Sequence, residues 1–211
     1  HFFKGVAHGW QGDLEVAGPC FERALELADR SGDAFRRYVI HGWRGEALLH
    51  AGELERAVAD LAACQDLAER IGSEFHRGGF LALRAEALLR RGETDAALQL
   101  SEAALALASR SQQAWSLSLA LRSHAEALAA TDPARSADAL DELRRATQIQ
   151  AEQDLVCDVA WTALAAARVL TAAGDIAAAG HEAARARDIF EKAGMRRAMD
   201  LPGPELSDRA A

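Results

Sequence analysis

Three glutamates recur at 40-residue steps in this chain, each with a basic residue one helical turn away. The pairs are Glu46 with His50, Glu86 with Arg90, and Glu126 with Arg122. Side chains four residues apart lie on the same face of a helix, so the members of each pair can neutralise one another. If they do not, the same row of carboxylates and cations forms a polar surface that can bind a charged ligand.

We interpret the pairs as structural, with each glutamate neutralised inside its own helix, and keep ligand binding as the alternative. On the alternative, the candidate binding surface consists of Glu46, His50, Glu86, Arg90, Arg122, Glu126, Trp161 and Arg168. Mixed charge beside an aromatic side chain suits a peptide or a partner helix better than a small metabolite. Within this surface, Arg122, Trp161 and Arg168 would form a more basic end that can receive a carboxylate.

Sequence patterns for catalysis, metals and cofactors are missing. No phosphate-binding Gly-x-x-x-x-Gly-Lys-Ser/Thr or Gly-x-Gly-x-x-Gly string occurs. The seven histidines include no His-x-x-x-His pair, and Cys20, Cys64 and Cys157 lack the spacing of a zinc site or a disulfide framework. We therefore predict a noncatalytic protein without metal or cofactor, and we expect the cysteines to be small core residues of a reducing compartment.

The overall charge is acidic. The formal net charge is −8 and the sequence pI is about 5.4, which opposes attraction to the phosphate backbone of DNA or RNA. No stretch reaches the roughly 18 apolar residues that a membrane-spanning helix needs, and the first residues lack a signal-peptide pattern. We expect a cytoplasmic protein that binds neither nucleic acid nor membrane directly.

The elements that must position these residues repeat along the chain. Turn residues stand at near-constant intervals of 40, 40, 40 and 42 residues, at Gly12, Gly52, Gly92, Asp132 and Gly174. Between them, apolar residues at gaps of three and four give each of two helices one apolar stripe. A period of about this length is typical of stacked helical hairpins, which bury their apolar faces only against neighbouring repeats.

The predicted fold class is therefore all-α: a right-handed superhelix, or α-solenoid, of about five antiparallel helical hairpins. One domain would cover residues 1–194, with repeats at about 1–32, 33–72, 73–112, 113–153 and 154–194 and with the first repeat truncated. Residues 195–211 would form a disordered C-terminal tail, because Pro202 and Pro204 interrupt any helix. Since the chain starts at His1 without a methionine, we also expect a fragment of a longer protein.

Small residues and turn residues predict how the hairpins pack. One frame position, where two helix backbones should approach closely, is occupied by Gly5, Gly45, Ala85, Ala125 and Ala167. Acidic residues follow the four turn glycines, at Asp13, Glu53, Glu93 and Asp175. We interpret these carboxylates as helix caps that complement the macrodipole of the next helix.

Three further features either add to this repeat pattern or depart from it. Pro19 should kink the second helix of the first repeat or stand in its first turn. Residues 131–133 should form a longer loop, because the spacing grows by two residues there. The aromatic residues Phe35, Phe75 and Trp115 recur near the starts of successive repeats, and we expect each to fill the seam between hairpins. An aromatic box for a ligand is the alternative.

The repeat resembles the tetratricopeptide repeat. The family pattern of a small residue, leucine, glycine and two alanines stands here at Ala85, Leu88, Gly92, Ala97 and Ala104. A large residue is usual between the two alanines; Phe21 supplies it in the first repeat, whereas Ser101 and Ala183 do not. The closing proline is absent, and the period is about 40 rather than about 34.

The lengthened form is similar to the repeat arrays of large bacterial signalling ATPases, including maltose-activator-like transcription regulators and ATPase-linked adenylate or guanylate cyclases. The resemblance covers about residues 1–194, and residues 184–195 look like the last helix of such arrays. It implies a scaffold for signal transduction or transcription regulation that binds a protein or peptide segment, or neighbouring domains of its own chain. The alternatives are a small-effector sensor domain and catalysis in flanking domains.

Overall fold

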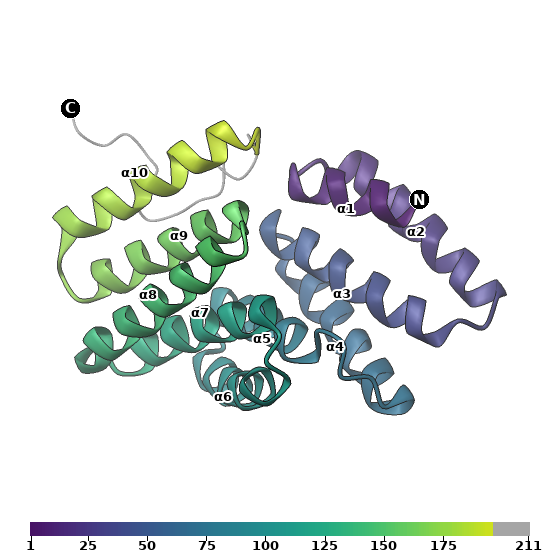
Figure 1. The fold of residues 1–211 in the computed structure, drawn as a ribbon, viewed down its shortest axis with the longest axis horizontal. Helices are drawn as coiled ribbons and strands as arrows, with labels where there is room; N and C mark the ends of the chain where they lie inside the picture. Colours follow the sequence, from purple (N-terminus) through teal and green to yellow (C-terminus); the bar gives the residue numbers. More distant parts are fainter. Residues whose placement is uncertain (196–211) are drawn as a thin grey trace.

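Ten α-helices and one short 3₁₀ helix form within residues 1–195, which are the residues that this computed structural model describes. They are α1 Phe2–Trp10, α2 Leu14–Arg30, α3 Ala34–His50, α4 Leu54–Ile71, α5 Arg77–Arg90, α6 Thr94–Ser111, α7 Ala114–Thr131, η1 Pro133–Arg135, α8 Ser136–Glu152, α9 Val156–Ala172 and α10 Ile176–Lys192. Each odd-numbered helix packs on the even-numbered helix that follows it (Figure 1). The structure is thus the all-α solenoid of helical hairpins that the repeat period predicts.

The turn glycines adopt the conformation expected at the end of a helix. The left-handed turn residues, with φ between 76° and 87°, are Gly12, Gly52, Gly92 and Gly174, and other residues adopt this region only at a cost. The acidic residue after each glycine takes the N-cap position of the next helix. Asp13 and Asp175 accept a hydrogen bond there from a backbone N–H, whereas Glu53 and Glu93 make no side-chain cap bond.

Small residues stand where helices cross. The five small residues of the predicted frame position are all buried. A Cβ added at Gly45 would lie 2.5 Å from Cγ of Leu61, and one added at Gly42 would lie 2.5 Å from the ring of Phe80. Both distances are shorter than van der Waals contact allows, so a larger residue would overpack the crossing. These glycines permit the close approach of neighbouring helices.

The structure bears on both irregular positions. Pro19 lies inside α2, beyond the first turn, so the alternative that this helix starts late is wrong, and the kink stays a prediction. The insertion in the fourth repeat forms the longer loop expected, because Asp132 accepts a hydrogen bond from the backbone N–H of Ala134 and η1 follows. Helix α8 then resumes the repeat.

The aromatic seam differs from the expectation. Phe35 and Phe75 are 47% and 42% exposed, so neither fills a seam; their rings contact each other instead, with centroids 5.8 Å apart. Tyr38 and Phe80 are fully buried between repeats and make an edge contact with centroids 5.7 Å apart. Trp115 is half-buried and packs on Phe80 at 5.7 Å. The interior is therefore filled by aromatic residues further along the first helices.

The array curls until its two ends approach each other. The odd-numbered helices form a continuous layer, in which α1 contacts α3, α3 contacts α5, α5 contacts α7 and α7 contacts α9. Figure 1 shows the end of α10 beside α1, and Trp10 at the end of α1 lines the same cavity as Met195 after α10. The curvature brings together residues that are far apart in the sequence.

The predicted disordered tail lies outside the described residues, apart from Met195, which is buried. Within residues 1–195, no helix combines the length and apolar character that crossing a membrane requires. The domain boundary near residue 194 stays a prediction.

Candidate functional site

Two of the three glutamates pair with arginines of the next repeat. Glu86 on α5 accepts a hydrogen bond from Nη2 of Arg122 on α7 at 3.0 Å. Glu126 on α7 accepts one from Nε of Arg168 on α9 at 2.5 Å. The partners are 36 and 42 residues apart in sequence. The direct ion pairs of these glutamates therefore tie successive repeats together and do not form within one helix, as the four-residue spacing had suggested; within α5, Arg90 acts on Glu86 only through its charge.

The expected intrahelical partners His50 and Arg90 have other contacts. Nη1 of Arg90 donates a hydrogen bond to the backbone carbonyl of Leu49 in the preceding repeat, at 2.7 Å. The imidazole of His50 on α3 stacks on the indole of Trp161 on α9, with centroids 4.2 Å apart and planes 11° from parallel. This stack joins the second repeat to the fifth. It closes the inner layer of helices instead of leaving an open groove.

Burial confirms that the candidate surface is not an open groove. Six of its eight residues are at most 6% exposed, namely Glu46, His50, Glu86, Arg122, Glu126 and Trp161; Arg90 and Arg168 are half-buried. Arg122 lies 3.7 Å from Asp158 in addition to its bond with Glu86, and Arg168 is paired with Glu126. The expected basic end is thus neutralised by carboxylates.

Glu46 is the one glutamate of the series without an arginine bond. Its carboxylate accepts a hydrogen bond from the indole N–H of Trp10, at 3.3 Å. Burial, followed by the nearby carboxylate of Asp158, raises the pKa of Glu46 to about 8, because an ionised carboxylate is poorly solvated there. The bond from Trp10 and the charge of Arg122 lower this pKa only in part. Glu46 therefore occupies a place short of positive charge.

The pKa values of the neighbouring groups His50 and Glu86 are lowered, whereas that of Glu46 is raised. Burial lowers the pKa of His50 to about 3, so this imidazole is neutral at physiological pH. Burial alone would raise the pKa of Glu86, but the guanidinium groups of Arg122, Arg168 and Arg90 outweigh it and hold that pKa well below its usual range. Glu86 is consequently an ionised carboxylate with its countercharge in place.

A cavity of about 240 Å³ lies where the first, second, fourth and fifth repeats meet. Its walls are Trp10, Trp43, Glu46, His50, Trp115, Asp154, Leu155, Val156, Cys157, Asp158, Trp161 and Met195. The chain contains four tryptophans, and all four line this space. We call it the tryptophan cavity.

The indoles of the tryptophan cavity come from four different helices. Trp10 ends α1, Trp43 lies in α3, Trp115 starts α7 and Trp161 lies in α9. Trp43 contacts Trp10 with ring centroids 6.0 Å apart and Trp115 with centroids 5.3 Å apart. Trp161 is held by His50 and by the edge of Phe190 at 4.8 Å. Each of the four indoles is thus in contact with at least one other ring.

Several buried polar atoms in the walls have no hydrogen-bond partner within residues 1–195. They are Nδ1 and Nε2 of His50 and Nε1 of Trp161, on side chains that are only 6% and 3% exposed. Unsatisfied buried donors and acceptors are rare in proteins and often mark a place for a ligand or water. The tryptophan cavity thus combines aromatic faces, carboxyl groups and unused hydrogen-bonding capacity.

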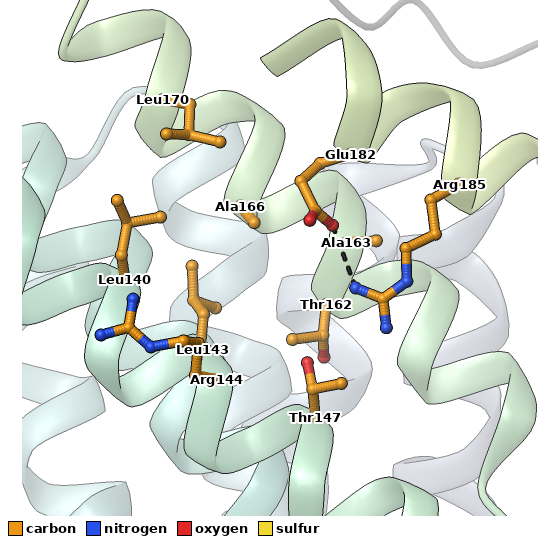
Figure 2. A pocket seen from close by; sticks show the side chains of 10 residues that line it. All are labelled: Leu140, Leu143, Arg144, Thr147, Thr162, Ala163, Ala166, Leu170, Glu182 and Arg185. Carbon is orange, nitrogen blue, oxygen red and sulfur yellow. Dashed lines mark hydrogen bonds and ion pairs between the residues drawn. The ribbon is translucent and has the colours of Figure 1, made fainter. Parts of the chain in front are cut away.

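Two other cavities are lined without tryptophan side chains. One, of about 320 Å³, lies between α8, α9 and α10 and is walled largely by aliphatic side chains, with the pair Arg185–Glu182 at 3.2 Å on one side (Figure 2). The other, of about 300 Å³, holds three of the predicted site residues, Arg90, Glu126 and Arg168. The structure thus divides the candidate surface, since Glu46, His50 and Trp161 line the tryptophan cavity.

Comparison with known proteins identifies the fold. A Rap protein solved in complex with competence and sporulation factor superposes with a TM-score of 0.65 at 17% identity, over 78% of this chain and 46% of that one. A kinesin light chain protein of nearly identical TPR-like repeats from Podospora anserina superposes with a TM-score of 0.57 at 18% identity, over 90% of this chain and 92% of that one. The fold is a tetratricopeptide-like helical array.

The chain spans less than half the length of the Rap protein that it matches. No protein-family model matches the sequence, and no curated protein matches it either. At these identities the similarity establishes the helical-repeat fold, so the site has to be judged on the residues of this chain.

Sequence reasoning named two of the four tryptophans, Trp161 in the candidate binding surface and Trp115 as a seam residue or, alternatively, part of an aromatic box. Trp10 occupies the same frame position as His50 and Arg90, at 40-residue steps, and Trp43 lies one helical turn before Glu46. Both signals were available, because these spacings place the side chains on the inner face. Residues 154–158, which end the loop before α9 and form its first turn, carried no such signal, since only the curvature of the array brings them to α1 and α3.

Proposed function

We propose that this chain is a noncatalytic interaction scaffold, which binds a protein or peptide segment or packs against neighbouring domains of its own chain. The observation that supports the proposal is an apolar edge at the two turns that join the first three repeats. This edge consists of Leu27, Phe35, Ile71 and Phe75, each between 37% and 47% exposed. The rings of Phe35 and Phe75 touch, so these two side chains form one exposed apolar patch across two repeats, and such patches often mark interaction surfaces.

The fold supports the same role. The Rap protein that it resembles was solved with a competence and sporulation factor bound, and helical arrays of this kind offer long surfaces to partners. The lengthened repeat further resembles the arrays of bacterial signalling ATPases. We therefore propose that the chain is the repeat region of a larger cytoplasmic bacterial protein in signalling or transcription regulation.

A capture experiment with matched variants tests the apolar edge. The double substitution Phe35→Ser and Phe75→Ser removes the touching rings, and Ile176→Ser, at a 59% exposed position on α10, controls for the loss of exposed apolar surface elsewhere. A partner retained by wild type and by the α10 variant but lost by the double variant supports the proposal. A partner held equally by all three would place binding on another surface.

A second candidate function is that of a small-effector sensor. The observation that favours it is the tryptophan cavity, with its unsatisfied buried atoms and its position where the ends of the array meet. A ligand there would bridge α1, α3, α7 and α9 and so alter the curvature. In a screen of small molecules by thermal unfolding, a true effector should stabilise wild type but not Trp10→Ala. Phe3→Ala, at an 83% exposed position of the same helix, is the control.

A further inference from the structure

The charge of the tryptophan cavity is one-sided. Among residues 1–195, the ionisable carboxyl groups in its walls are Glu46, Asp154 and Asp158, and no lysine or arginine of this part of the chain lines it. The buried cation Arg122 already contacts Glu86 and Asp158. The raised pKa values of Glu46 and Asp158 fit this imbalance, since burial disfavours both carboxylates and the charge of Asp158 further raises the pKa of Glu46.

The aromatic walls indicate which class of cation the cavity can bind. The faces of indole rings attract cations through their quadrupole, and tryptophan does so best. A primary ammonium brings three N–H donors and a guanidinium brings five, and a donor that points at an indole ring meets no carboxyl or imidazole acceptor there. A quaternary ammonium has no N–H groups, and its methyl groups pack against indole faces. The walls therefore suit an alkylated cation.

We propose that the tryptophan cavity binds a small quaternary ammonium compound of the choline type. The volume of about 240 Å³ accommodates one such group with a short polar arm, but not a length of peptide. The hydroxyl of choline can then bond to the unpaired His50 or Trp161 nitrogen atoms. This inference rests on the effector-sensor candidate and names its ligand class.

The carboxyl-rich walls also predict which quaternary ammonium compounds fail. Glycine betaine carries a carboxylate and phosphocholine a phosphate, and either anion would lie beside Glu46 and Asp158. Both should bind more weakly than choline. Stronger binding of phosphocholine would assign the cavity to lipid headgroups and overturn the proposal of a free, choline-like compound.

Calorimetric titration with matched ligands, read together with tryptophan fluorescence, tests the proposal on the complete chain. The ligands are choline, ethanolamine as the primary ammonium, and dimethylbutanol, the neutral alcohol in which carbon replaces the choline nitrogen. We expect choline to bind at least about tenfold more tightly than dimethylbutanol, since cation–π attraction is lost with the charge. Ethanolamine should bind more weakly than choline.

Two variants test whether choline binds in the tryptophan cavity. Trp10→Ala should weaken choline binding by about tenfold or more, whereas Phe3→Ala should leave it unchanged. Trp10 is 45% exposed, so the variant should keep its fold, and its circular dichroism spectrum checks this. Binding that is equally strong in Trp10→Ala would contradict the assignment to this cavity.

The outcomes separate this inference from the effector-sensor candidate. Equal binding of choline and dimethylbutanol would overturn the cation inference while leaving an apolar effector cavity. If neither choline nor its neutral analogue binds, the choline-type ligand is wrong. The effector-sensor candidate then depends on its own small-molecule screen, in which a different stabilising ligand, sensitive to Trp10→Ala, would still support it.

Discussion

Replacing Glu46 by glutamine should remove a large pH dependence from the stability of this protein. The pKa of Glu46 is raised to about 8 in the folded chain, against about 4.3 in an unfolded one. Between these values the folded state holds a proton that the unfolded state has lost. Stability from this group is therefore fully present below about pH 4.3 and is lost as the pH rises through about 8.

The size of the effect follows from the two pKa values. Proton linkage gives a loss of roughly 2 to 3 kcal/mol in the free energy of unfolding of wild type between pH 6 and pH 9. For a chain of 211 residues this corresponds to a fall in Tm of roughly 5 to 10 °C. The Glu46→Gln variant lacks this contribution. Groups that do not interact with Glu46 contribute alike to both proteins, so the difference between the two pH profiles reports Glu46 together with its coupling to neighbours such as Asp158.

The assay is thermal or urea unfolding followed by circular dichroism at pH 6 and pH 9, for wild type, Glu46→Gln and the exposed control Glu102→Gln. We expect the stability of Glu46→Gln to increase relative to that of wild type as the pH rises. The stability of Glu102→Gln should change with pH as that of wild type does. If Glu46→Gln and wild type lose stability equally between the two pH values, Glu46 is not a buried carboxyl short of positive charge, and the reasoning fails.

Two further predictions concern the contacts between repeats. Arg122→Met should destabilise the fold by about 3 to 5 kcal/mol, because it leaves the carboxylate of Glu86 buried without its partner. In urea unfolding, the double variant with Glu86→Gln added should recover much of this loss. Additive losses would show that the two residues are not coupled. Gly42→Ala should lower the free energy of unfolding by about 1 to 3 kcal/mol, since its Cβ would meet the ring of Phe80. The control Gly180→Ala, with no atom within 4 Å of its Cβ, should be neutral or stabilising by up to about 1 kcal/mol. A stabilising Gly42→Ala would contradict the close crossing of the helices.

The repeat architecture could be predicted because its determinants are local. Turn glycines such as Gly52 and Gly92 need a left-handed conformation that few other residues adopt, and small residues such as Gly45 mark helix crossings. These features recur in sequence at the period of the structure. The exposure of Phe35 and Phe75 was mispredicted because their spacing fixes only their place in the repeat, not the depth at which neighbouring helices cover them.

The candidate site was only partly predictable because its pairs form across repeats. Glu86 has Arg90 four residues away and Arg122 in the next repeat, and sequence spacing alone does not decide between them. Stacking brings Arg122 to Glu86, and Arg90 turns to a backbone carbonyl. The contact of His50 with Trp161 depends on curvature summed over four repeats, which no local pattern encodes.

The array closes on itself through the contact of His50 with Trp161, so that an aromatic cavity takes the place of the expected groove. Titration of the histidine side chains by NMR, with His50 assigned through His50→Gln, tests this most directly. We predict that His50 stays neutral down to at least pH 4.5, because its pKa is about 3, and that its ring signals are shifted by the stacked indole. Trp161→Leu should abolish that shift. A His50 that titrates near pH 6.5, without a ring-current shift, would show an open groove and contradict the account.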